Sequence, residues 1–399
     1  MRARFHVVTV RHPNGERLPI LLDGDRQPIA WINSYVIRRL RPRLAVSSLV
    51  KTLFVLGYVW QWAETDAFPL EARLVSGEGL TPDEIVSRVY PWLRRNFRIA
   101  GEVRKLVVSP GTVVFRLNVV LRCVAWHLEC AMATMPAGSQ QIVDARERLA
   151  VIRRSFATAA RTRLPTASHA APLTEMQLQR LLQVCHPDSC ENPWKRPYRE
   201  RNFLIVLILA TLGIRRGELL KLRVSDCLLS RAIPEVRVER SPDDPADPRM
   251  HEPQVKTESR HLPCDVSLAR YLNEYICKIR RLMPGASRCP FLLLSRTGQP
   301  MSLVRVNGLI DQIAHVNPEF SDLHPHCLRS TCATRFREAA RRNGVDEERI
   351  DKDMMYFFGW RSADSVTPYI EAAIRREACE IGLSYQAMLF GRVAARSDA

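Results

Sequence analysis

Residues 158–172 constrain the fold more than any other feature, because they separate two long stretches of regular sequence. This segment, TAARTRLPTASHAAP, is rich in small residues and lacks apolar periodicity, as an extended linker would. A chain of 399 residues is also long enough to bury two hydrophobic cores. We therefore expect an N-terminal part over residues 1–157, a linker over residues 158–172 and a C-terminal domain over residues 173–399.

The chain is strongly basic, with a formal net charge of +17. Residues 1–165 hold 25 Lys and Arg against 13 Asp and Glu, so most of the excess lies in the N-terminal part. Such an excess points to a polyanionic partner, with nucleic acid as the first candidate and an acidic membrane surface as the second. One basic cluster lies ahead of Ser109, where phosphate contact and a merely solvated face are equal alternatives. Its members are Arg94, Arg95, Arg98, Arg104 and Lys105.

The first thirty residues differ from the sequence that follows. Strand-forming residues over 5–10 and 18–22 flank a turn at residues 13–15, Pro-Asn-Gly. This pattern predicts a short β-hairpin within residues 1–30. We expect the hairpin to cover the domain that follows, with contact to DNA or a partner as the alternative.

Residues 31–157 are predicted to form a helical domain, because their apolar residues recur at helical spacing. Ser47 and Ser48 can cap one helix, and residues 81–84, Thr-Pro-Asp-Glu, open another. Ser109 followed by Pro110 begins a third, with proline at the first helical position.

The C-terminal domain begins with clear helix signals. Thr174 and Gln177 form a capping-box pattern, and a strongly apolar helix is expected over residues 203–212. Gly213 breaks that helix, and residues 215–222 can start the next one. From residue 266 onward the chain is again mostly helical.

Strand-like segments lie between these helices, at residues 235–239, 254–256 and 260–263. A turn at residues 257–259 would join the last two and place Lys256 at the tip of a hairpin. Residues 241–253 hold four prolines and are predicted to form a loop. The predicted fold class is therefore mainly α with a small β-sheet, an α+β architecture.

Eleven cysteines, an odd number scattered through apolar segments, favour reduced thiols over a disulfide framework. Cys185, His186 and Cys190 resemble half of a metal site, but a second ligand pair at zinc-finger spacing is missing. We therefore expect no metal and no other cofactor. Without an apolar run long enough to span a bilayer or a signal-type start, the chain is expected to be cytoplasmic.

Six residues of the C-terminal domain form a set suited to metal-free chemistry on a phosphodiester. Two guanidinium groups can hold the non-bridging oxygens as negative charge builds up around the phosphorus. A tyrosine hydroxyl can attack the phosphorus, and a lysine can protonate the departing sugar oxygen. A histidine and an indole N–H add proton handling and hydrogen bonds. The set is Arg215, Lys256, His326, Arg329, Trp360 and Tyr369.

These residues stand in motifs that resemble the tyrosine recombinase (phage integrase) family. Residues 211–219 read TLGIRRGEL, residues 326–329 read His-x-x-Arg, and residues 358–360 read Phe-Gly-Trp. Tyr369 follows Trp360 by nine positions, as the family tyrosine follows its Leu-Gly-His segment. The motifs cover about residues 172–390, and the helical region before them resembles the family's core-binding domain less specifically.

The resemblance assigns two arginines to the scissile phosphate, Arg215 and Arg329. Arg216 is a competing candidate by chemistry, but the motif register favours Arg215. His326 matches the histidine of His-x-x-Arg, whereas His324 has the wrong spacing to share a helical face with Arg329.

The remaining members also follow from the resemblance. Lys256 matches the mobile hairpin lysine, the family's general acid, and Tyr369 matches the nucleophile. Trp360 stands where most relatives have histidine, and an indole donates a hydrogen bond but cannot take up a proton. Glu218 and residues 331–334 resemble supporting positions whose ordinary role is structural.

The mechanism implied by the resemblance is attack of Tyr369 on DNA, giving a 3′-phosphotyrosyl link, followed by rejoining to a partner strand without ATP or metal. The implied partners are double-stranded DNA, gripped by a two-domain clamp, and three further copies of the chain in a homotetramer, with partner recombinases or DNA-bending proteins where needed. The tail at about residues 375–393 would form a helix that docks on a neighbouring subunit or packs on its own domain.

The implied function is site-specific recombination for integration, excision or transposition of a mobile element, by a nucleoid-associated protein of a bacterium or phage. Two alternatives stay open. A type IB topoisomerase-like enzyme would share the chemistry but religate its own strand, and a catalytically idle accessory protein would bind DNA only.

Overall fold

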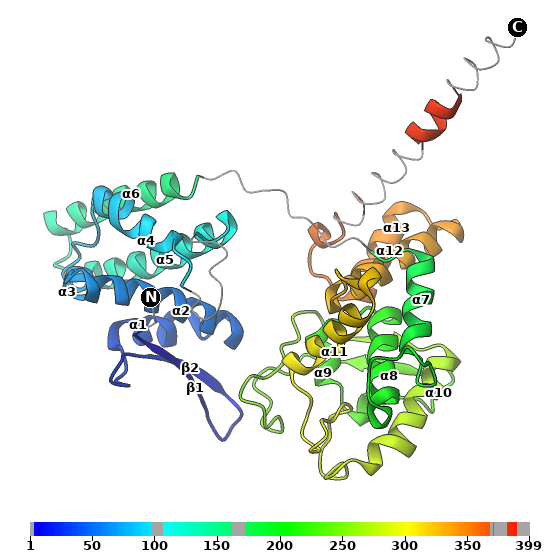
Figure 1. Ribbon diagram of the computed structural model, residues 1–399. Coiled ribbons are helices and arrows are strands. Elements are labelled where there is room, and N and C mark those ends of the chain that lie inside the picture. Colours follow the sequence, from blue (N-terminus) through cyan, green and yellow to red (C-terminus); the bar gives the residue numbers. More distant parts are fainter. Residues whose placement is uncertain (1–3, 98–106, 162–171, 368–369, 371–380, 389–399) are drawn as a thin grey trace, which may run out of the picture. The chain divides into compact units, whose positions relative to one another are not determined.

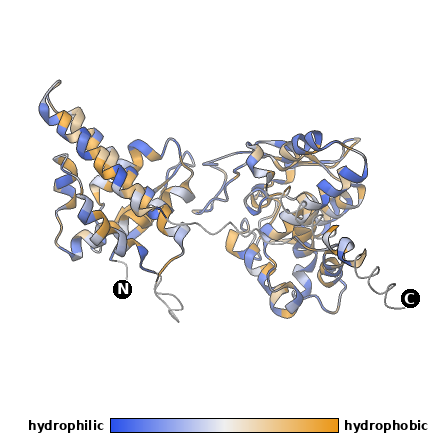
Figure 2. Ribbon diagram, turned by 90° about the horizontal axis from the view of Figure 1, so that it is seen from above, coloured by the Kyte–Doolittle hydropathy of each residue, from blue (hydrophilic) through white to orange (hydrophobic). Residues whose placement is uncertain are grey.

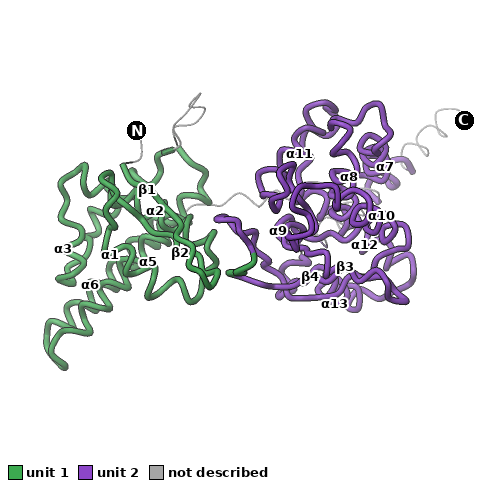
Figure 3. The backbone as a smooth tube through the Cα atoms, turned by 90° about the horizontal axis from the view of Figure 1, so that it is seen from below, with its two compact units in different colours: residues 1–167, 243–246 green, residues 168–242, 247–399 purple. Residues whose placement is uncertain are grey.

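A computed structural model describes residues 4–97, 107–161, 172–367, 370 and 381–388. The chain divides into two compact units (Figure 3). The N-terminal unit comprises residues 1–167 with residues 243–246, and the C-terminal unit comprises residues 168–242 and 247–399. Helices dominate both units, and each unit contains a small antiparallel sheet (Figure 1). The expected fold class, mainly α with a small β-sheet, is confirmed.

The N-terminal unit begins with the predicted β-hairpin. Strand β1 (His6–Arg11) pairs with β2 (Arg17–Leu22), with His6 opposite Leu22. The inward face of β2 is buried and packs against helix α2 (Val46–Thr65). Gly57 of α2 leaves room for the ring of Phe5, which a Cβ at that position would approach to 2.5 Å. The hairpin therefore covers the helical part of its unit, as expected.

Helices pack around α2 to form the N-terminal core, in which Trp62, Leu53 and Leu128 are buried. The predicted start at Ser109 is confirmed, because its side chain accepts a hydrogen bond from the backbone of Thr112. The remaining helical elements are α1 (Ala30–Tyr35), η1 (Val36–Leu40), α3 (Leu70–Val75), η2 (Glu84–Val89), α4 (Tyr90–Arg94), α5 (Pro110–Ala133) and α6 (Gln140–Ala159).

Two expected helix boundaries in this unit are wrong. Helix α2 starts at Val46, so Ser47 and Ser48 lie inside it, and its N-cap Ala45 makes no side-chain hydrogen bond. Burial of Val46 and Leu49 outweighs the serine signal there. Helix α6 ends at Ala159, two residues inside the expected linker, and residues 162–171 lie outside the described part of the chain.

The C-terminal unit is built around helix α8 (Arg199–Thr211), whose residues Phe203 to Leu209 are almost all buried. A helix that is apolar all round belongs in the centre of a core. The predicted capping box of Thr174 and Gln177 is confirmed at the start of α7. The surrounding helices are α7 (Glu175–Cys185), α9 (Arg216–Lys221), α10 (Val266–Glu274), α11 (Leu303–Val316), α12 (Pro325–Arg342) and α13 (Glu347–Phe358). Of the expected tail helix, residues 381–388 are described and are helical.

The C-terminal sheet has the order β3-β4-β5 and is antiparallel throughout. Its strands are β3 (Cys227–Leu228), β4 (Glu235–Val238) and β5 (Arg260–Pro263). The expected strand at residues 254–256 is wrong, because these residues have no regular structure and β5 pairs with β4 instead. The backbone of Gln254 lies against α9, where a Cβ on Gly217 would come within 2.3 Å of its carbonyl oxygen. Lys256 therefore lies in the long β4–β5 connection and not at the tip of a tight hairpin.

Apolar and polar residues share the helices of both units (Figure 2), as expected of helices that bury one face. Within the described residues, no helix has the length and hydropathy needed to cross a membrane.

His127 provides a pH-dependent test of the N-terminal core. Its imidazole packs 4.7 Å from Trp126 and 5.5 Å from Trp31, between ring centroids, and its buried Nε2 has no hydrogen-bond partner among the described residues. Burial lowers the pKa of His127 to about 4. An unfolded histidine titrates near pH 6.5, so the unfolded chain binds the extra proton between these values. We predict that the free energy of unfolding of this unit falls as the pH drops from about 6.5 to about 4.

Urea unfolding at several pH values, followed by tryptophan fluorescence, measures this dependence. His127→Phe should flatten the pH profile over that window, whereas His6→Gln, at an exposed position in β1, serves as the matched control. An unchanged profile in His127→Phe would contradict the assignment.

Candidate active site

The turn between α8 and α9 places Arg215 at the edge of the C-terminal core. Gly213 breaks the helix as predicted, with a φ of +56°, and a Cβ there would lie 2.5 Å from the ring of Phe358. Only glycine adopts this left-handed conformation at so close an approach. The carbonyl of Gly213 accepts a hydrogen bond from Arg329 Nη1 at 2.6 Å. The turn thus joins the segment of one predicted arginine to the side chain of the other.

Glu218 is a buried carboxylate that collects donors from several segments. Its Oε1 accepts from Thr257 Oγ1 at 2.6 Å, and its Oε2 accepts from Arg260 Nη2 at 2.9 Å and from the backbone N–H of Arg215 at 3.1 Å. Burial alone would raise the pKa of Glu218, but the charges of Arg260 and Arg329 and these hydrogen bonds hold that pKa below its ordinary value. The carboxylate is therefore ionised at neutral pH.

Arg215 and Arg216 are adjacent but have different surroundings. Arg215 Nη1 is buried 3.6 Å from Glu218 Oε1 and has no hydrogen-bond partner among the described residues. Arg216 instead donates to the side-chain oxygen of Asn307 in α11. A guanidinium that is held beside a carboxylate while a third of its side chain stays exposed is suited to bind an anion. These contacts favour Arg215 over Arg216, in agreement with the motif register.

Arg329 lies one turn after His326 on α12, and its side chain is almost fully buried. Besides Gly213, it donates to the carbonyl of Phe358 at 2.9 Å, and its guanidinium lies over the Phe358 and Trp360 rings at 5.2 and 5.6 Å. His326 is exposed. His324 is the N-cap of α12, where its Nδ1 accepts from the backbone N–H of Cys327 at 3.0 Å.

Trp360 follows the left-handed Gly359, which ends α13 with a φ of +62°. The backbone N–H of Trp360 donates to the carbonyl of Met355 at 2.9 Å, and its ring stacks on Phe358 with centroids 4.9 Å apart. The indole is thereby fixed beside Arg329. Tyr369 lies outside the described residues.

Lys256 is exposed, and its side chain forms no hydrogen bond or ion pair with the other described residues. The next residue, Thr257, is buried through its contact with Glu218. The structure therefore brings the segments of Arg215, Lys256, Arg329 and Trp360 together around Glu218. Thr331, in the expected supporting stretch, joins the backbones of Leu173 and Cys327 through its hydroxyl, a structural role.

Arg260 belongs to this site but is missing from the sequence-based set. Its side chain is 1% exposed and bonds to Glu218, Thr257 and the carbonyl of Phe357. One signal could have identified it. Arg260 and Leu262 occupy the inward positions of β5, and a charged residue at such a position requires a buried partner.

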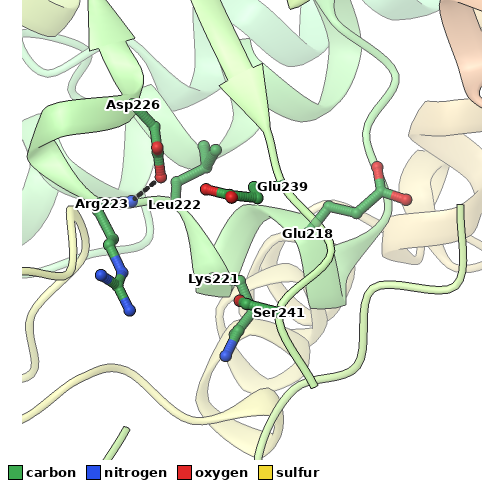
Figure 4. Close-up of a pocket in the computed structure, with 7 residues that line it drawn as sticks. All are labelled: Glu218, Lys221, Leu222, Arg223, Asp226, Glu239 and Ser241. Atoms are coloured by element: carbon green, nitrogen blue, oxygen red, sulfur yellow. Dashed lines mark hydrogen bonds between the residues drawn. The ribbon is translucent and has the colours of Figure 1, made fainter. Parts of the chain in front are cut away.

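A polar cavity of about 150 Å³ lies beside α9 (Figure 4). Of the predicted site residues it borders only Glu218, and its wall carries both signs of charge. One wall is fixed by Asp226, which accepts a hydrogen bond from the backbone N–H of Arg223 at 2.9 Å. The lining residues are Glu218, Lys221, Leu222, Arg223, Asp226, Glu239 and Ser241.

The basic cluster of the N-terminal unit is described only in part. Arg94 and Arg95 are exposed, with their guanidinium groups 5.5 Å from the Tyr90 ring and 4.7 Å from the Trp92 ring. The other three candidates, Arg98, Arg104 and Lys105, lie outside the described residues. The described cysteines are free thiols, and no group of three His, Cys, Asp or Glu side chains within the described ranges could hold a metal ion.

The phage integrase family model matches residues 172–376, more than half of the chain. The chain belongs to the phage integrase family. This family is that of the tyrosine recombinases, which cleave and rejoin DNA. The match spans every residue of the candidate active site, from Arg215 to Tyr369.

Solved structures similar to this integrase-family chain include the Tn1549 transposon integrase in complex with a circular-intermediate DNA. That structure is 17% identical, covers 87% of this chain and 98% of its own, and has a TM-score of 0.50. XerA recombinase is 17% identical over 88% of this chain and 97% of its own, with a TM-score of 0.39. The post-cleavage complex of XerH recombinase is 13% identical, covers 88% of this chain and 94% of its own, and has a TM-score of 0.46. Comparison with curated protein sequences gives no match.

A buried ion pair anchors the loop that precedes Lys256. Lys221 Nζ donates to Glu252 Oε1 at 2.6 Å, and both side chains are almost fully buried. Removing one partner of such a pair leaves an uncompensated buried charge. We predict that Lys221→Met lowers the free energy of unfolding by about 3–5 kcal/mol.

Urea unfolding of the full chain measures this loss. Lys221→Met with Glu252→Gln should recover part of the loss, because position 252 then carries no charge, while Asp247, which lies 3.8 Å from Lys221 Nζ, keeps its pair with Arg249. Lys278→Met, which breaks an exposed pair with Glu274, should cost no more than about 0.5 kcal/mol. An equal loss of unfolding free energy in Lys221→Met and Lys278→Met would contradict a larger contribution from the buried pair.

Proposed function

We propose that this chain is a site-specific DNA recombinase that cleaves and rejoins DNA through a 3′-phosphotyrosyl intermediate on Tyr369. The process served is integration, excision or transposition of a mobile element. One observation carries the proposal: Arg215, Arg329 and the Lys256 segment converge on Glu218 within the family-matched residues. This set has the charges that transfer of a phosphodiester requires.

The two arginines would stabilise the pentacoordinate phosphate. Arg215 is held 3.6 Å from an ionised carboxylate, and the third of its side chain that is exposed leaves guanidinium N–H groups for the phosphate. Arg329 is held by the carbonyls of Gly213 and Phe358, so its position costs little reorganisation during the reaction. Trp360 can add an indole N–H donor, but it cannot exchange a proton.

Bond making and proton transfer balance without a further reactant. The phenol oxygen of Tyr369 forms a bond to phosphorus as the bond from phosphorus to the 5′ oxygen breaks. The ammonium of Lys256 gives its proton to the departing 5′ oxygen, and the phenol proton passes to His326 or solvent. A 5′-hydroxyl from a partner strand then attacks the phosphotyrosine and releases Tyr369, so the bond energy is conserved and ATP is not consumed.

Double-stranded DNA is the proposed substrate, bound by a homotetramer on paired sites. Arg94 and Arg95 of the exposed basic cluster would contact phosphates, together with Arg98, Arg104 and Lys105. The similar Tn1549 transposon integrase is bound to a circular-intermediate DNA in its structure, which supports this choice. Partner recombinases or DNA-bending proteins would bind in addition to the homotetramer.

Replacing Tyr369 with Phe tests the proposal. We predict that the variant loses covalent attachment to DNA but keeps its DNA affinity within about threefold, because only the attacking oxygen is removed. Denaturing capture from cells, with sequencing of attached DNA, measures the first property, and filter binding the second. Tyr356→Phe, at an exposed position, is the matched control.

Attachment of the native chain at one recurrent sequence is the expected result. Scattered attachment would favour topoisomerase-like relaxation, and attachment that survives Tyr369→Phe would contradict the assigned nucleophile. Tight DNA binding with no attachment by the native chain, in the presence of a paired site, would favour an accessory protein.

Arg215 and Arg216 provide a matched pair for the phosphate contact. We predict that Arg215→Lys slows single-turnover cleavage by about 10²-fold or more, as loss of one oxyanion donor does. Arg216→Lys should slow it by less than about threefold, since its contact is with Asn307. Equal slowing by both variants, or a larger effect at Arg216, would contradict the assignment.

A further inference from the structure

Arg260 connects three segments of the candidate active site. Nη2 donates to Glu218 of α9 at 2.9 Å, and Nη1 donates to Thr257 Oγ1 at 3.0 Å and to the carbonyl of Glu258 at 3.3 Å. Nε donates to the carbonyl of Phe357, near the end of α13, at 2.7 Å. The side chain is almost fully buried. One guanidinium therefore holds α9, the Lys256 loop and the segment leading to Trp360.

The contacts among Arg260, Glu218 and Thr257 form a closed triangle. Thr257 Oγ1 accepts from Arg260 Nη1 and donates to Glu218 Oε1, while Glu218 Oε2 accepts from Arg260 Nη2. Each member thus fixes the other two, and the hydroxyl direction of Thr257 is determined. Thr257 directly follows Lys256, so the triangle fixes the backbone from which the lysine projects.

The Gly359 turn packs directly on this triangle. A Cβ at Gly359 would lie 2.8 Å from Arg260 Nη1 and 2.9 Å from Thr257 Cβ. The backbone N–H of Glu258 also donates to the carbonyl of Gly359 at 3.4 Å, and Arg361 pairs with the Glu258 carboxylate. The Lys256 loop and the Gly359–Trp360 turn are therefore held against each other at several points, with Arg260 between them.

Lysine could not reproduce this arrangement. A guanidinium offers five N–H donors in a planar fork, whereas an ammonium is a single point charge on a flexible stem. Burying an ion pair seldom adds net stability over apolar packing, so a precise geometry is what this pair can supply. Here the Arg260 guanidinium fixes the position of Thr257, the residue next to Lys256.

We propose that Arg260 is a positioning residue that holds Lys256 in place to protonate the departing 5′ oxygen. The inference rests on the proposed function, because it assigns the consequence of Arg260 to one step of that reaction. Arg260 itself is enclosed by protein groups and acts through Thr257 and Glu218.

The leaving group of the DNA substrate provides a specific readout. A scissile phosphate with sulfur in place of the bridging 5′ oxygen releases a thiolate, which needs no proton from Lys256. A defect in proton donation therefore disappears with this substrate, whereas a defect in phosphate stabilisation or in folding remains.

The experiment compares single-turnover cleavage of the oxygen-bridged and sulfur-bridged duplexes by the full chain. We predict that Arg260→Lys slows cleavage of the oxygen-bridged duplex by about 10²-fold, as loss of a general acid does. The same variant should cleave the sulfur-bridged duplex within about threefold of the native rate. Lys256→Ala should show the same pattern, and Arg215→Lys should be slow on both duplexes. Arg280→Lys, a buried arginine that bonds to carbonyls at residues 286–292, is the matched control and should match the native chain on both.

Equal slowing on both duplexes by Arg260→Lys, or no slowing on either, would overturn the inference. If Arg260→Lys does not fold, Thr257→Val replaces it, because that change removes the hydroxyl between Arg260 and Glu218 at nearly constant volume. Equal slowing of both duplexes by Thr257→Val, or no slowing of either, would then overturn the inference. Failure of the native chain to cleave either duplex would count against the proposed function, which keeps the two failures distinct.

Discussion

Glu218 places an ionised carboxylate inside the C-terminal core, and the site around it depends on how that charge is satisfied. A buried carboxylate is costly unless it is paired and hydrogen-bonded. Here the backbone of Arg215, the Thr257 hydroxyl and the Arg260 guanidinium meet that requirement. Because these donors come from separate segments, satisfying one charge assembles the start of α9, the Lys256 loop and β5 at one point. The need to pair the buried Glu218 carboxylate thus determines how these three segments are arranged.

Two left-handed glycines complete the arrangement by turning backbone carbonyls toward an arginine. Gly213 accepts from Arg329 directly, and Gly359 ends α13 just after Phe358, whose carbonyl also accepts from Arg329. Cβ atoms at either glycine would meet neighbouring side chains within 3 Å. The guanidinium is thereby oriented by main-chain groups, which move less than side chains do. A preorganised cation of this kind is what a developing phosphate charge requires.

Local signals predicted much of the fold and part of the site. The caps at Ser109 and Thr174 and the break at Gly213 depend on neighbouring residues, so the sequence alone was enough to find them. The strand expected at residues 254–256 fails because Gln254 lies against Gly217, a contact that no local pattern contains. Arg260 was missed because its partners lie up to 97 residues away, and only its inward position in β5 could have indicated a buried partner. Tyr369 remains a prediction from its place after Trp360.

The proposed function requires that this assembled site direct Tyr369 to attack a phosphodiester of DNA. The most direct measurement is mass spectrometry of the protein–DNA adduct after nuclease trimming and proteolysis. We predict a nucleotide 3′-phosphate on the peptide that contains Tyr369, with fragmentation that assigns the mass to its side chain. An adduct on any other residue, or a trapped complex in which the Tyr369 peptide is unmodified, would show that Tyr369 is not the nucleophile.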